Sequence, residues 1–271
     1  MIPIITIMTD FGLRDGYVGE MKGVILGIAP EARLVDITHI IHPQNVLEAA
    51  VTFNRSAPYF PEGSIHVCVV DPGVGTARRP LAARIGAQRF VGPDNGIISL
   101  LLARARREGW PVDIVHLDQP RCWRTEISNV FHGRDIFAPV AAHLANGAAL
   151  TAVGSSIDDP VLLPLALAER TADGLRGVIL HIDHFGNVAT NIRVEDLAGL
   201  GDVIVRAGGA EVQGLARAFG ERAPGELIAF FSSHGELALA VVNGNAGQRL
   251  RARVGDPIEV IRSGATEVAT T

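Results

Sequence analysis

Four polar clusters in this chain combine residue types that can bind or activate a small polar molecule. They occupy 9–12, 69–82, 131–135 and a C-terminal pair of segments, 181–187 with 232–235. Most of them follow an apolar run that is typical of a buried strand. Ligands of open α/β sheets bind beyond the carboxyl ends of the strands. We therefore treat these clusters as the candidate functional sites.

The stretch VVDPGVGTARRPLA places a carboxylate at the end of an apolar strand and returns two arginines to it within one loop. Asp71 and Arg78 are seven residues apart, a spacing that allows them to pair, and Arg79 is the alternative partner. Spacing alone slightly favours a structural salt bridge. The glycines of the loop let backbone approach a ligand closely. The pattern is neither a dinucleotide fingerprint nor a phosphate loop, because the third glycine and a clear following helix are missing.

Two further clusters are ambiguous when each is considered alone. Asp10, in TDFG, could accept two hydrogen bonds from a ribose diol. It could equally be a turn or N-cap residue. His132, in FHGRD, is a candidate acid, base or water-polarising group. A lone histidine is more often structural, and the neighbouring Arg134 and Asp135 could simply serve the start of a helix.

The histidines offer little support for a metal site. His181 and His184 flank an aspartate, but residues three apart on a strand face opposite sides. The rest of a ligand set is missing, and His39 and His42 form a similarly weak pair. We therefore expect no metal.

The elements that must position these clusters follow two patterns. The first half alternates strand-like runs with helical periodicity, which predicts a layered α/β domain with helices on both faces of a sheet. After about residue 154 the chain becomes short strands and turns, which predicts an all-β, barrel-like domain. We expect an α/β domain over 1–160, a linker over 161–174 and a β-barrel-like domain over 175–271. Expected strands are 4–8, 34–37, 65–70, 81–85, 89–91, 113–117, 177–182, 188–192, 203–206, 227–231, 237–242 and 258–261; expected helices are 17–29, 46–56, 96–107 and 135–145.

Composition narrows the class of protein. The 271 residues are 48% hydrophobic and 20% charged, which is typical of a globular protein, and the net charge of -5 argues against nucleic acid or an anionic membrane as partner. Cys68 and Cys122 lack metal-type spacing and suit a reducing cytoplasm. Neither a signal peptide nor a bilayer-spanning run is evident. We therefore expect a soluble, cytoplasmic protein.

The motifs TDFG, VDPGVGTARR, GPDNG, FHGRD, DHFGN and SSHGELALA occur in this order over nearly the whole chain. Together they resemble the adenosine-forming S-adenosyl-L-methionine (SAM) hydrolases, also called SAM hydroxide adenosyltransferases, which are relatives of the fluorinases and chlorinases. The resemblance implies a mixed-sheet α/β domain joined to a β-barrel-like domain. It also implies a homotrimer whose sites form between the first domain of one subunit and the second domain of its neighbour. SAM would be the substrate, and no cofactor is implied.

Two departures from the halogenases favour the hydrolase form. The halogenases carry an extra loop before the counterpart of GPDNG, whereas here 81–85 reaches 92–94 without an insertion. They also lack the acidic residue found here at Asp71. Gln44 lies where the halogenases have a tryptophan against the ligand, and His234 lies where they have an arginine.

The resemblance also implies residue roles. An Asp-Arg-His trio would handle the nucleophilic water, and by motif position these residues are Asp71, Arg78 and His132, with Arg79 kept open by the doubled arginine. Substrate contacts would come from Asp10 (ribose hydroxyls), Asp183 (methionine ammonium), Asn187 (adenine), Phe219 (stacking), Ser233 (methionine carboxylate) and His234, whose role is less defined.

The expected reaction is an SN2 attack of water on the ribose 5′ carbon, releasing neutral methionine. We expect Arg78 to lower the pKa of Asp71, which makes it a weak base and delays proton transfer. Three alternatives remain open at this point: a halide-using 5′-halo-5′-deoxyadenosine synthase, a SAM- or adenosine-binding sensor without turnover, and a nucleotide-dependent α/β enzyme of another type.

Overall fold

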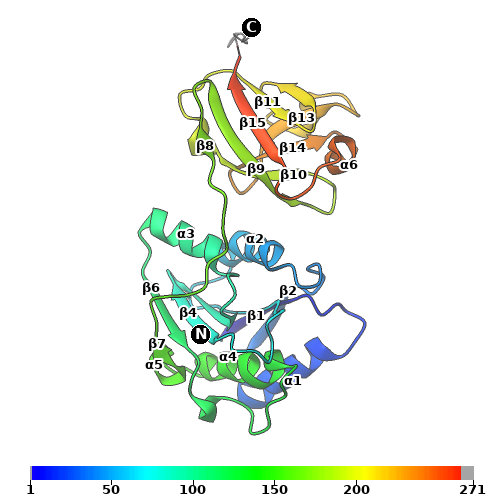
Figure 1. The fold of residues 1–271 in the computed structure, drawn as a ribbon. Coiled ribbons are helices and arrows are strands. Elements are labelled where there is room, and N and C mark those ends of the chain that lie inside the picture. Colours follow the sequence, from blue (N-terminus) through cyan, green and yellow to red (C-terminus); the bar gives the residue numbers. More distant parts are fainter. Residues whose placement is uncertain (1, 264–271) are drawn as a thin grey trace. The chain divides into compact units, whose positions relative to one another are not determined.

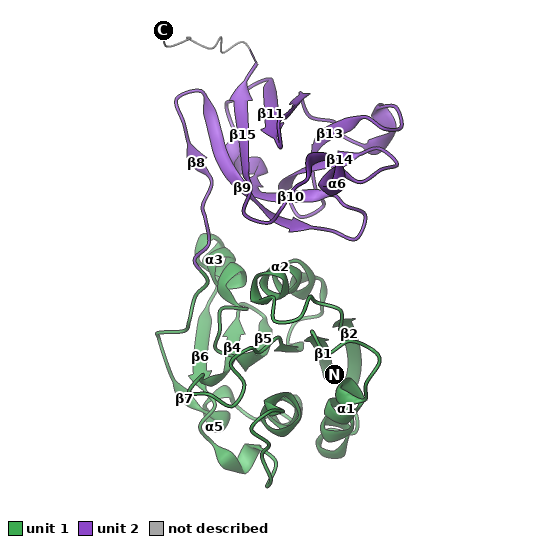
Figure 2. Ribbon diagram, turned by 45° about the vertical axis from the view of Figure 1, so that its right-hand side comes forward, with its two compact units in different colours: residues 1–163 green, residues 164–271 purple. Residues whose placement is uncertain are grey.

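The structure, a computed structural model, describes residues 2–263. The chain forms two compact units, Met1–Leu163 and Pro164–Thr271 (Figure 2). The division falls within the segment that we expected to be a linker. Each unit has its own hydrophobic core and is described by itself.

A seven-stranded mixed sheet forms the centre of unit 1 (Figure 1). Its strands lie in the order β2-β1-β3-β5-β4-β6-β7. The first four are parallel, whereas β4 is antiparallel to both of its neighbours and β7 is antiparallel to β6. The parallel part brings the carboxyl ends of β1 and β3 to the same edge of the sheet. The bounds are β1 Ile4–Thr9, β2 Arg33–Thr38, β3 Ile65–Val69, β4 Pro80–Ile85, β5 Gln88–Pro93, β6 Val112–His116 and β7 Ser155–Ser156.

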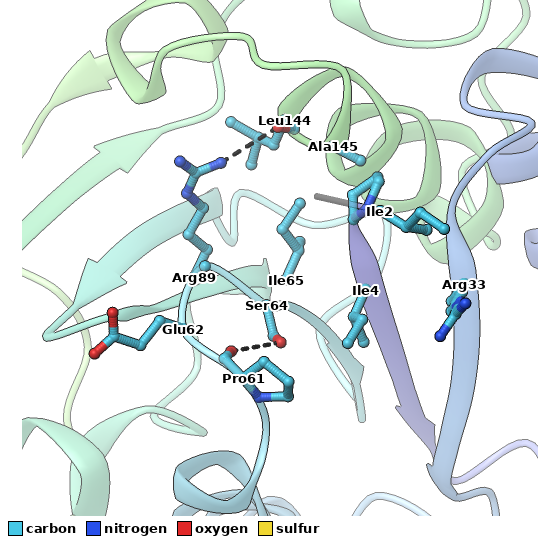
Figure 3. Close-up of a pocket in the computed structure, with 12 residues that line it drawn as sticks. Ile2, Ile4, Arg33, Pro61, Glu62, Ser64, Ile65, Arg89, Leu144 and Ala145 are labelled. Carbon is cyan, nitrogen blue, oxygen red and sulfur yellow. Dashed lines mark hydrogen bonds between the residues drawn. The ribbon is translucent and has the colours of Figure 1, made fainter.

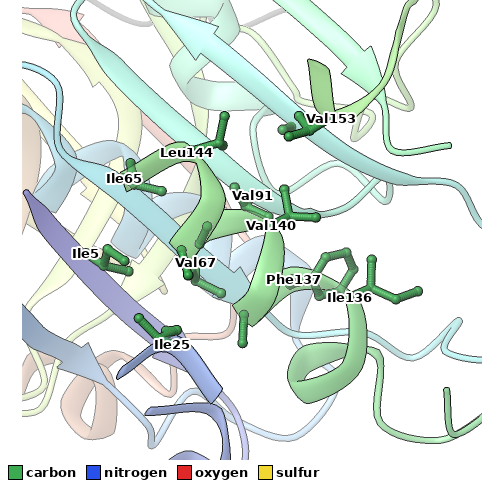
Figure 4. Close-up of a cluster of buried hydrophobic side chains, with 14 of the residues drawn as sticks. Ile5, Ile25, Ile65, Val67, Val91, Ile136, Phe137, Val140, Leu144 and Val153 are labelled. Carbon is green, nitrogen blue, oxygen red and sulfur yellow. The ribbon is translucent and has the colours of Figure 1, made fainter. Parts of the chain in front are cut away.

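Helices cover both faces of this sheet, which explains why β1 and β3 are apolar along nearly their whole length. One core lies under α1 and α4 (Figure 4), and a second lies under α2 and α3. Helix α2 begins where the sequence predicts, because the Asn45 side chain accepts the Glu48 N–H as an N-cap. The bounds are α1 Tyr17–Ile28, α2 Val46–Ser56, α3 Ser99–Glu108, α4 Ala138–Ala145 and α5 Leu150–Val153.

Two helices differ from the expected ranges at their N-termini. The helix expected from residue 96 begins at Ser99, because Gly96 has a φ of 101°, outside the helical region. The helix expected from residue 135 is divided. A π-helical turn, Gly133–Phe137, precedes α4. Such turns are rare and often lie at functional sites, and this one directly follows His132.

Unit 2 is an antiparallel, nearly closed barrel. Seven strands lie in the order β12-β11-β15-β9-β10-β14-β13, and β8 pairs with β9. Just beyond β12, the Ala216 N–H donates to the Ala229 carbonyl in β13 at 2.8 Å, so the two edges approach each other. The predicted fold class is thus confirmed, although β8, β12 and α6 were missed. The bounds are β8 Glu169–Arg170, β9 Gly174–Ile182, β10 Val188–Arg193, β11 Val203–Ala207, β12 Ala210–Gln213, β13 Leu227–Phe231, β14 Glu236–Val241, α6 Ala246–Leu250 and β15 Pro257–Arg262.

The helices and the two cysteines bear on whether the protein has a membrane segment or a disulfide. Across residues 2–263, no helix has the length and apolar character needed to cross a membrane. Both cysteines are buried as free thiols, and burial raises the pKa of Cys68 well above its usual value. These thiols therefore act as small core residues.

Candidate active site

A pocket of about 280 Å³ opens at the carboxyl edge of the unit 1 sheet. Three of the predicted side chains line it: Asp10, Asp71 and His132. Asp10 comes directly after β1, Asp71 follows β3, and His132 directly precedes the π-turn. The fold therefore brings three sequence clusters to one place, as the parallel topology predicts.

Arg78 joins two of these side chains. Its Nε donates to Asp71 Oδ1 at 3.1 Å, its Nη2 donates to Asp71 Oδ2 at 2.5 Å, and the same Nη2 lies 3.0 Å from His132 Nδ1. The pair is nearly buried, with side-chain exposures of 8% and 5% for the arginine and the aspartate. Arg78 Nη1 is buried and has no protein acceptor among residues 2–263. A buried N–H of this kind needs a partner such as a bound water or substrate oxygen.

Close backbone contact holds the two loops of the trio together. Gly75 has a φ of 76°, and a Cβ at this position would lie 2.3 Å from the carbonyl oxygen of Asn129. Only glycine meets both demands. The loop that carries Asp71 and Arg78 can therefore press against the loop that carries His132.

The buried Asp135 holds the loop that carries His132 in place through hydrogen bonds. Its carboxylate is fully buried and accepts hydrogen bonds from Arg124 Nη1, Arg134 Nε and the Ser128 N–H. Burial raises the pKa of Asp135, but these hydrogen bonds outweigh burial and hold it below its usual value. Asp135 is thus an ionised anchor, a larger role than serving the start of a helix.

The electrostatics of Asp71 correct one expectation. Arg78 does lower the pKa of Asp71, as the sequence suggested, but burial acts in the opposite direction and is the larger effect. The pKa of Asp71 is therefore raised, not lowered. The expectation was wrong because the desolvation of a carboxylate cannot be read from an Asp-Arg spacing. The carboxylate is a better base than the ion pair alone would make it.

His132 is neutral in this setting. Burial, followed by the nearby Arg78 cation, lowers its pKa below the usual value. Because Arg78 Nη2 is a donor, His132 Nδ1 accepts in this contact, and the ring proton resides on Nε2. His132 therefore offers an N–H donor and is not a free base.

Arg79 has different partners. Its Nε donates to Asp94 Oδ2 at 2.9 Å and its Nη1 donates to Asp159 Oδ1 at 2.8 Å. The other oxygen of Asp94 accepts the Val161 N–H at 2.8 Å. Arg78 thus occupies the position paired with Asp71, while Arg79 ties 159–161 to the sheet.

Asp10 is held by the backbone of a neighbouring loop. Its Oδ2 accepts the Gln44 N–H at 2.8 Å, and Gln44 itself has a positive φ of 66°. Such a backbone conformation is uncommon for a residue other than glycine. Gln44 also lines the pocket, at the wall where the halogenases were expected to differ.

Unit 2 has its own pocket, of about 810 Å³, lined by Asp183, Asn187 and Phe219. Asn187 Nδ2 donates to Asp183 Oδ2 at 2.8 Å, which leaves the amide oxygen of Asn187 available as an acceptor. Phe219 is 45% exposed and packs against Phe230. His184 lies in the turn after β9, beyond the strand expected over 177–182, so the alternation of side chains along a strand, which counted against a metal pair with His181, does not apply to it.

The structure does not bring the last two predicted residues into that lining. Ser233 and His234 lie in the turn between β13 and β14, where Ser233 is exposed. Ser233 Oγ lies 3.4 Å from His234 Nδ1, and Ser232 Oγ accepts the His234 N–H.

A second pocket of unit 1, about 430 Å³, lies at the amino-terminal edge of the sheet (Figure 3). Ile4 and Ile65 lie between Arg33 and Arg89, and Arg89 Nη1 donates to the Leu144 carbonyl. None of the predicted residues lines this pocket. Its greater size therefore does not make it the reaction site. Within residues 2–263, no group of three or more metal-ligating side chains is present.

Comparison with known families decides the relationship. Residues 5–154 match the N-terminal domain of the SAM hydroxide adenosyltransferases, and residues 177–259 match their C-terminal domain. The chain belongs to the SAM hydroxide adenosyltransferase family. The relationship that the motifs suggested is thus confirmed.

Individual relatives of this family support the assignment. The chain is 40% identical to the (R)-S-adenosyl-L-methionine hydrolase of Salinispora tropica, over 95% of this chain and 97% of that protein. A crystal structure of an uncharacterized conserved protein from Thermotoga maritima superposes with a TM-score of 0.87 at 37% identity, covering 95% of this chain and 100% of that one. The fluorinase of Actinoplanes is more distant, at 31% identity over 73% of this chain and 75% of the enzyme.

The site geometry agrees with a hydrolase-type member of the family. Strands β4 and β5 form a tight hairpin in which Ile85 pairs with Gln88. The β4–β5 connection accordingly contains no insertion of the kind expected in the halogenases. Asp71, the acidic residue that the resemblance associates with the hydrolase form, lies in the pocket.

Proposed function

We propose that this protein hydrolyses (R)-S-adenosyl-L-methionine to adenosine and L-methionine. The observation that carries the proposal is the Asp71–Arg78–His132 cluster at the pocket, with a buried Arg78 N–H that lacks a protein acceptor. The identity of the substrate is inferred from the (R)-S-adenosyl-L-methionine hydrolases to which the chain is similar. SAM is the substrate here, and the chemistry requires no cofactor.

The cluster suits attack by water on the ribose 5′ carbon. A bond forms between the water oxygen and C5′ while the C5′–S bond breaks, and its electron pair leaves with sulfur as a neutral thioether. No general acid is needed on that side. One proton of the water passes to Asp71, whose raised pKa favours its role as acceptor.

Arg78 and His132 assist from the donor side. Arg78 Nη1 donates to the water oxygen and stabilises the negative charge that develops there. One lone pair of the water attacks C5′ and the other accepts from Arg78, so the Nε2–H of His132 becomes a second donor to this oxygen once a proton has passed to Asp71. Positioning the water in line with the C–S bond supplies much of the acceleration.

The binding residues divide between the units. Asp10, through the carboxylate oxygen not bonded to Gln44, receives the ribose hydroxyls. The amide oxygen of Asn187 accepts from the adenine amino group, and Phe219 stacks on the ring. Asp183 receives the methionine ammonium, and Ser233 with His234 addresses its carboxylate.

A homotrimer would unite the two sets of residues, with unit 1 of one subunit meeting unit 2 of its neighbour. Unit 1 carries three strongly exposed apolar side chains in loops at the carboxyl edge of the sheet: Leu13, Ile40 and Val130, 71% to 78% exposed. Exposed apolar side chains gathered at one edge support an interface there. The trimer, the absence of nucleic-acid and membrane partners, and the cytoplasmic location remain predictions.

The decisive experiment is incubation of the purified protein with each sulfonium epimer of SAM in oxygen-18 water, with and without halide. Mass spectrometry of the products is the readout. Oxygen-18 in the 5′-hydroxyl of adenosine, together with methionine and faster turnover of the (R) epimer, is expected.

Other products would identify the alternatives. A 5′-halo-5′-deoxyadenosine formed only with halide would make the protein a halogenase. Tight binding of SAM without any product would make it a sensor. Either result would overturn the proposed hydrolysis.

A further inference from the structure

A second chain of buried polar groups ends beside Asp10 and has no place in the reaction proposed above. His39, which directly follows β2, is 3% exposed. Its Nδ1 lies 3.0 Å from Thr9 Oγ1, and its Nε2 lies 3.0 Å from Asp36 Oδ1. The Asp36 contact has the distance of an ion pair but not the angle of a hydrogen bond. The sequence alone identifies His39 only as one member of a weak metal-ligand pair with His42.

One arrangement of the protons satisfies the donors of this chain. Thr9 Oγ1 accepts the Phe11 N–H at 3.2 Å, so its hydroxyl proton is available for His39 Nδ1. In this arrangement the ring proton lies on Nε2, the ring nitrogen nearer to Asp36. Lys22 Nζ donates to the other oxygen of Asp36 at 2.6 Å. Polar contacts thus connect the Phe11 amide, through Thr9 and His39, to the Lys22–Asp36 pair at the surface.

The same histidine also holds the turn through its backbone. The Gly12 N–H donates to the His39 carbonyl at 2.7 Å. Thr9, Phe11 and Gly12 are therefore all tied to His39, directly or through one hydroxyl, and Asp10 lies between them in the sequence. From the other side, the Gln44 N–H donates to the Asp10 carboxylate.

We propose that the Thr9–His39 pair is a positioning device that aims the Asp10 carboxylate at the ribose diol and so sets the preference for ribose over 2′-deoxyribose. The inference rests on the proposed function, in which Asp10 receives the ribose hydroxyls. A carboxylate that must accept two hydrogen bonds from a rigid diol has little tolerance for rotation. Anchoring of both flanking residues restricts that rotation.

Strand β1 provides a matched control. Thr6 is as fully buried as Thr9, and its Oγ1 lies 2.7 Å from Nδ1 of another buried histidine, His66. Thr6 is three residues earlier on β1 and lies away from the pocket at its carboxyl end. Thr6→Val and Thr9→Val therefore remove the same type of hydrogen bond, but only the second touches the Asp10 turn.

Calorimetric binding of adenosine and 2′-deoxyadenosine tests the proposal without requiring turnover. The wild type is expected to bind adenosine about tenfold more tightly, the usual value of a hydrogen bond to a charged group. Thr9→Val and His39→Leu are expected to lose most of this ratio, and Thr9→Ser to keep it. Thr6→Val is expected to keep the wild-type ratio, although it lowers the melting temperature as Thr9→Val does.

Folded Thr9→Val and His39→Leu proteins with the wild-type ratio would overturn the inference, as would an equal loss in Thr6→Val. If these variants do not fold, His39→Asn and His39→Gln decide. Asparagine presents an amide group near the place of Nδ1 and is expected to keep the ratio, whereas glutamine reaches toward the place of Nε2 and is expected to lower it. Equal ratios in these two variants would contradict the proposal.

Different results would refute the role of the Thr9–His39 pair and the proposed hydrolysis of SAM. A wild type that binds both nucleosides equally would remove Asp10 from ribose recognition and the inference with it. Discrimination between the nucleosides without hydrolysis of SAM would refute the hydrolase proposal alone and leave the inference standing.

Discussion

The polar groups of the two units are held in opposite ways. In unit 1, Arg78 joins a carboxylate seven residues away to a histidine 54 residues away, and the ion pair is nearly buried. In unit 2, Asp183 and Asn187 are four residues apart in one turn, beside a half-exposed Phe219. Groups that activate a water must be desolvated and locked. Groups that recognise a base can be built on a local turn.

The largest expected effect comes from removing the carboxylate of unit 1. Asp71→Asn keeps the shape but loses the proton acceptor, and kcat is expected to fall by about 10²- to 10⁴-fold. Adenosine affinity, measured by calorimetry, should stay near the wild-type value because the proposed adenosine contacts are made by other residues. A folded variant with nearly unchanged kcat would show that unit 1 does not carry the chemistry.

The doubled arginine sharpens the comparison within unit 1. Arg78→Gln removes the donor to the attacking water, and kcat should fall by about 10²- to 10³-fold. Arg79→Gln is the matched control, because its partners are Asp94 and Asp159 rather than Asp71. This variant should keep kcat and become more sensitive to proteolysis at 158–163. The opposite pattern of rates would exchange the roles of the two arginines.

Acid should destabilise unit 1 through His66. Burial lowers the pKa of His66 to about 4, below its unfolded value of 6.5. The unfolded state therefore binds the proton more readily, so stability is complete above pH 6.5 and is lost as pH falls toward 4. The loss is about 3 kcal/mol at most.

Urea unfolding at pH 4.5 and 7 measures this loss. Tryptophan fluorescence reports on unit 1, because Trp110 and Trp123 both belong to it. His66→Gln is expected to flatten the difference between the two pH values. An equal difference in this variant would assign the acid sensitivity to other groups.

The smallest effect is expected in unit 2. Asn187→Ala removes the proposed acceptor for the adenine amino group, so KM should rise about tenfold with little change in kcat. With a substrate analogue that lacks the 6-amino group, the same substitution should cost almost nothing. A penalty that persists on the analogue would mean that Asn187 shapes the turn and does not read the base.

Contacts between residues far apart in the chain could not be predicted from the sequence, whereas local elements could. Helix α2 was predicted with its observed bounds because its signals, an N-cap and an apolar period, are local. The choice of Arg78 over Arg79 by motif offset agrees with the observed contact to Asp71. The raised pKa of Asp71 was missed because it depends on burial, which a spacing does not encode. The Thr9–His39 pair was missed because its members are 30 residues apart.

Short elements were missed for a different reason. Strand β12 has four residues and β8 has two, too few to show a period. Their strand conformation comes from pairing with β11 and β9. The division of the helix near His132 into a π-turn and α4 has no signal in the apolar period of the sequence.

The contacts of Arg79 also determine where a fragment that contains only unit 1 should end. The match to the N-terminal domain ends at residue 154, and a fragment cut there would lose β7 and the segment that Asp94 and Arg79 hold. It would leave the buried Asp94 without its Val161 donor and Ser99 Oγ without the Leu163 N–H. A fragment that ends after Leu163 keeps every one of these bonds. A fragment of unit 1 should therefore end after Leu163, nine residues beyond residue 154, where the match to the N-terminal family domain ends.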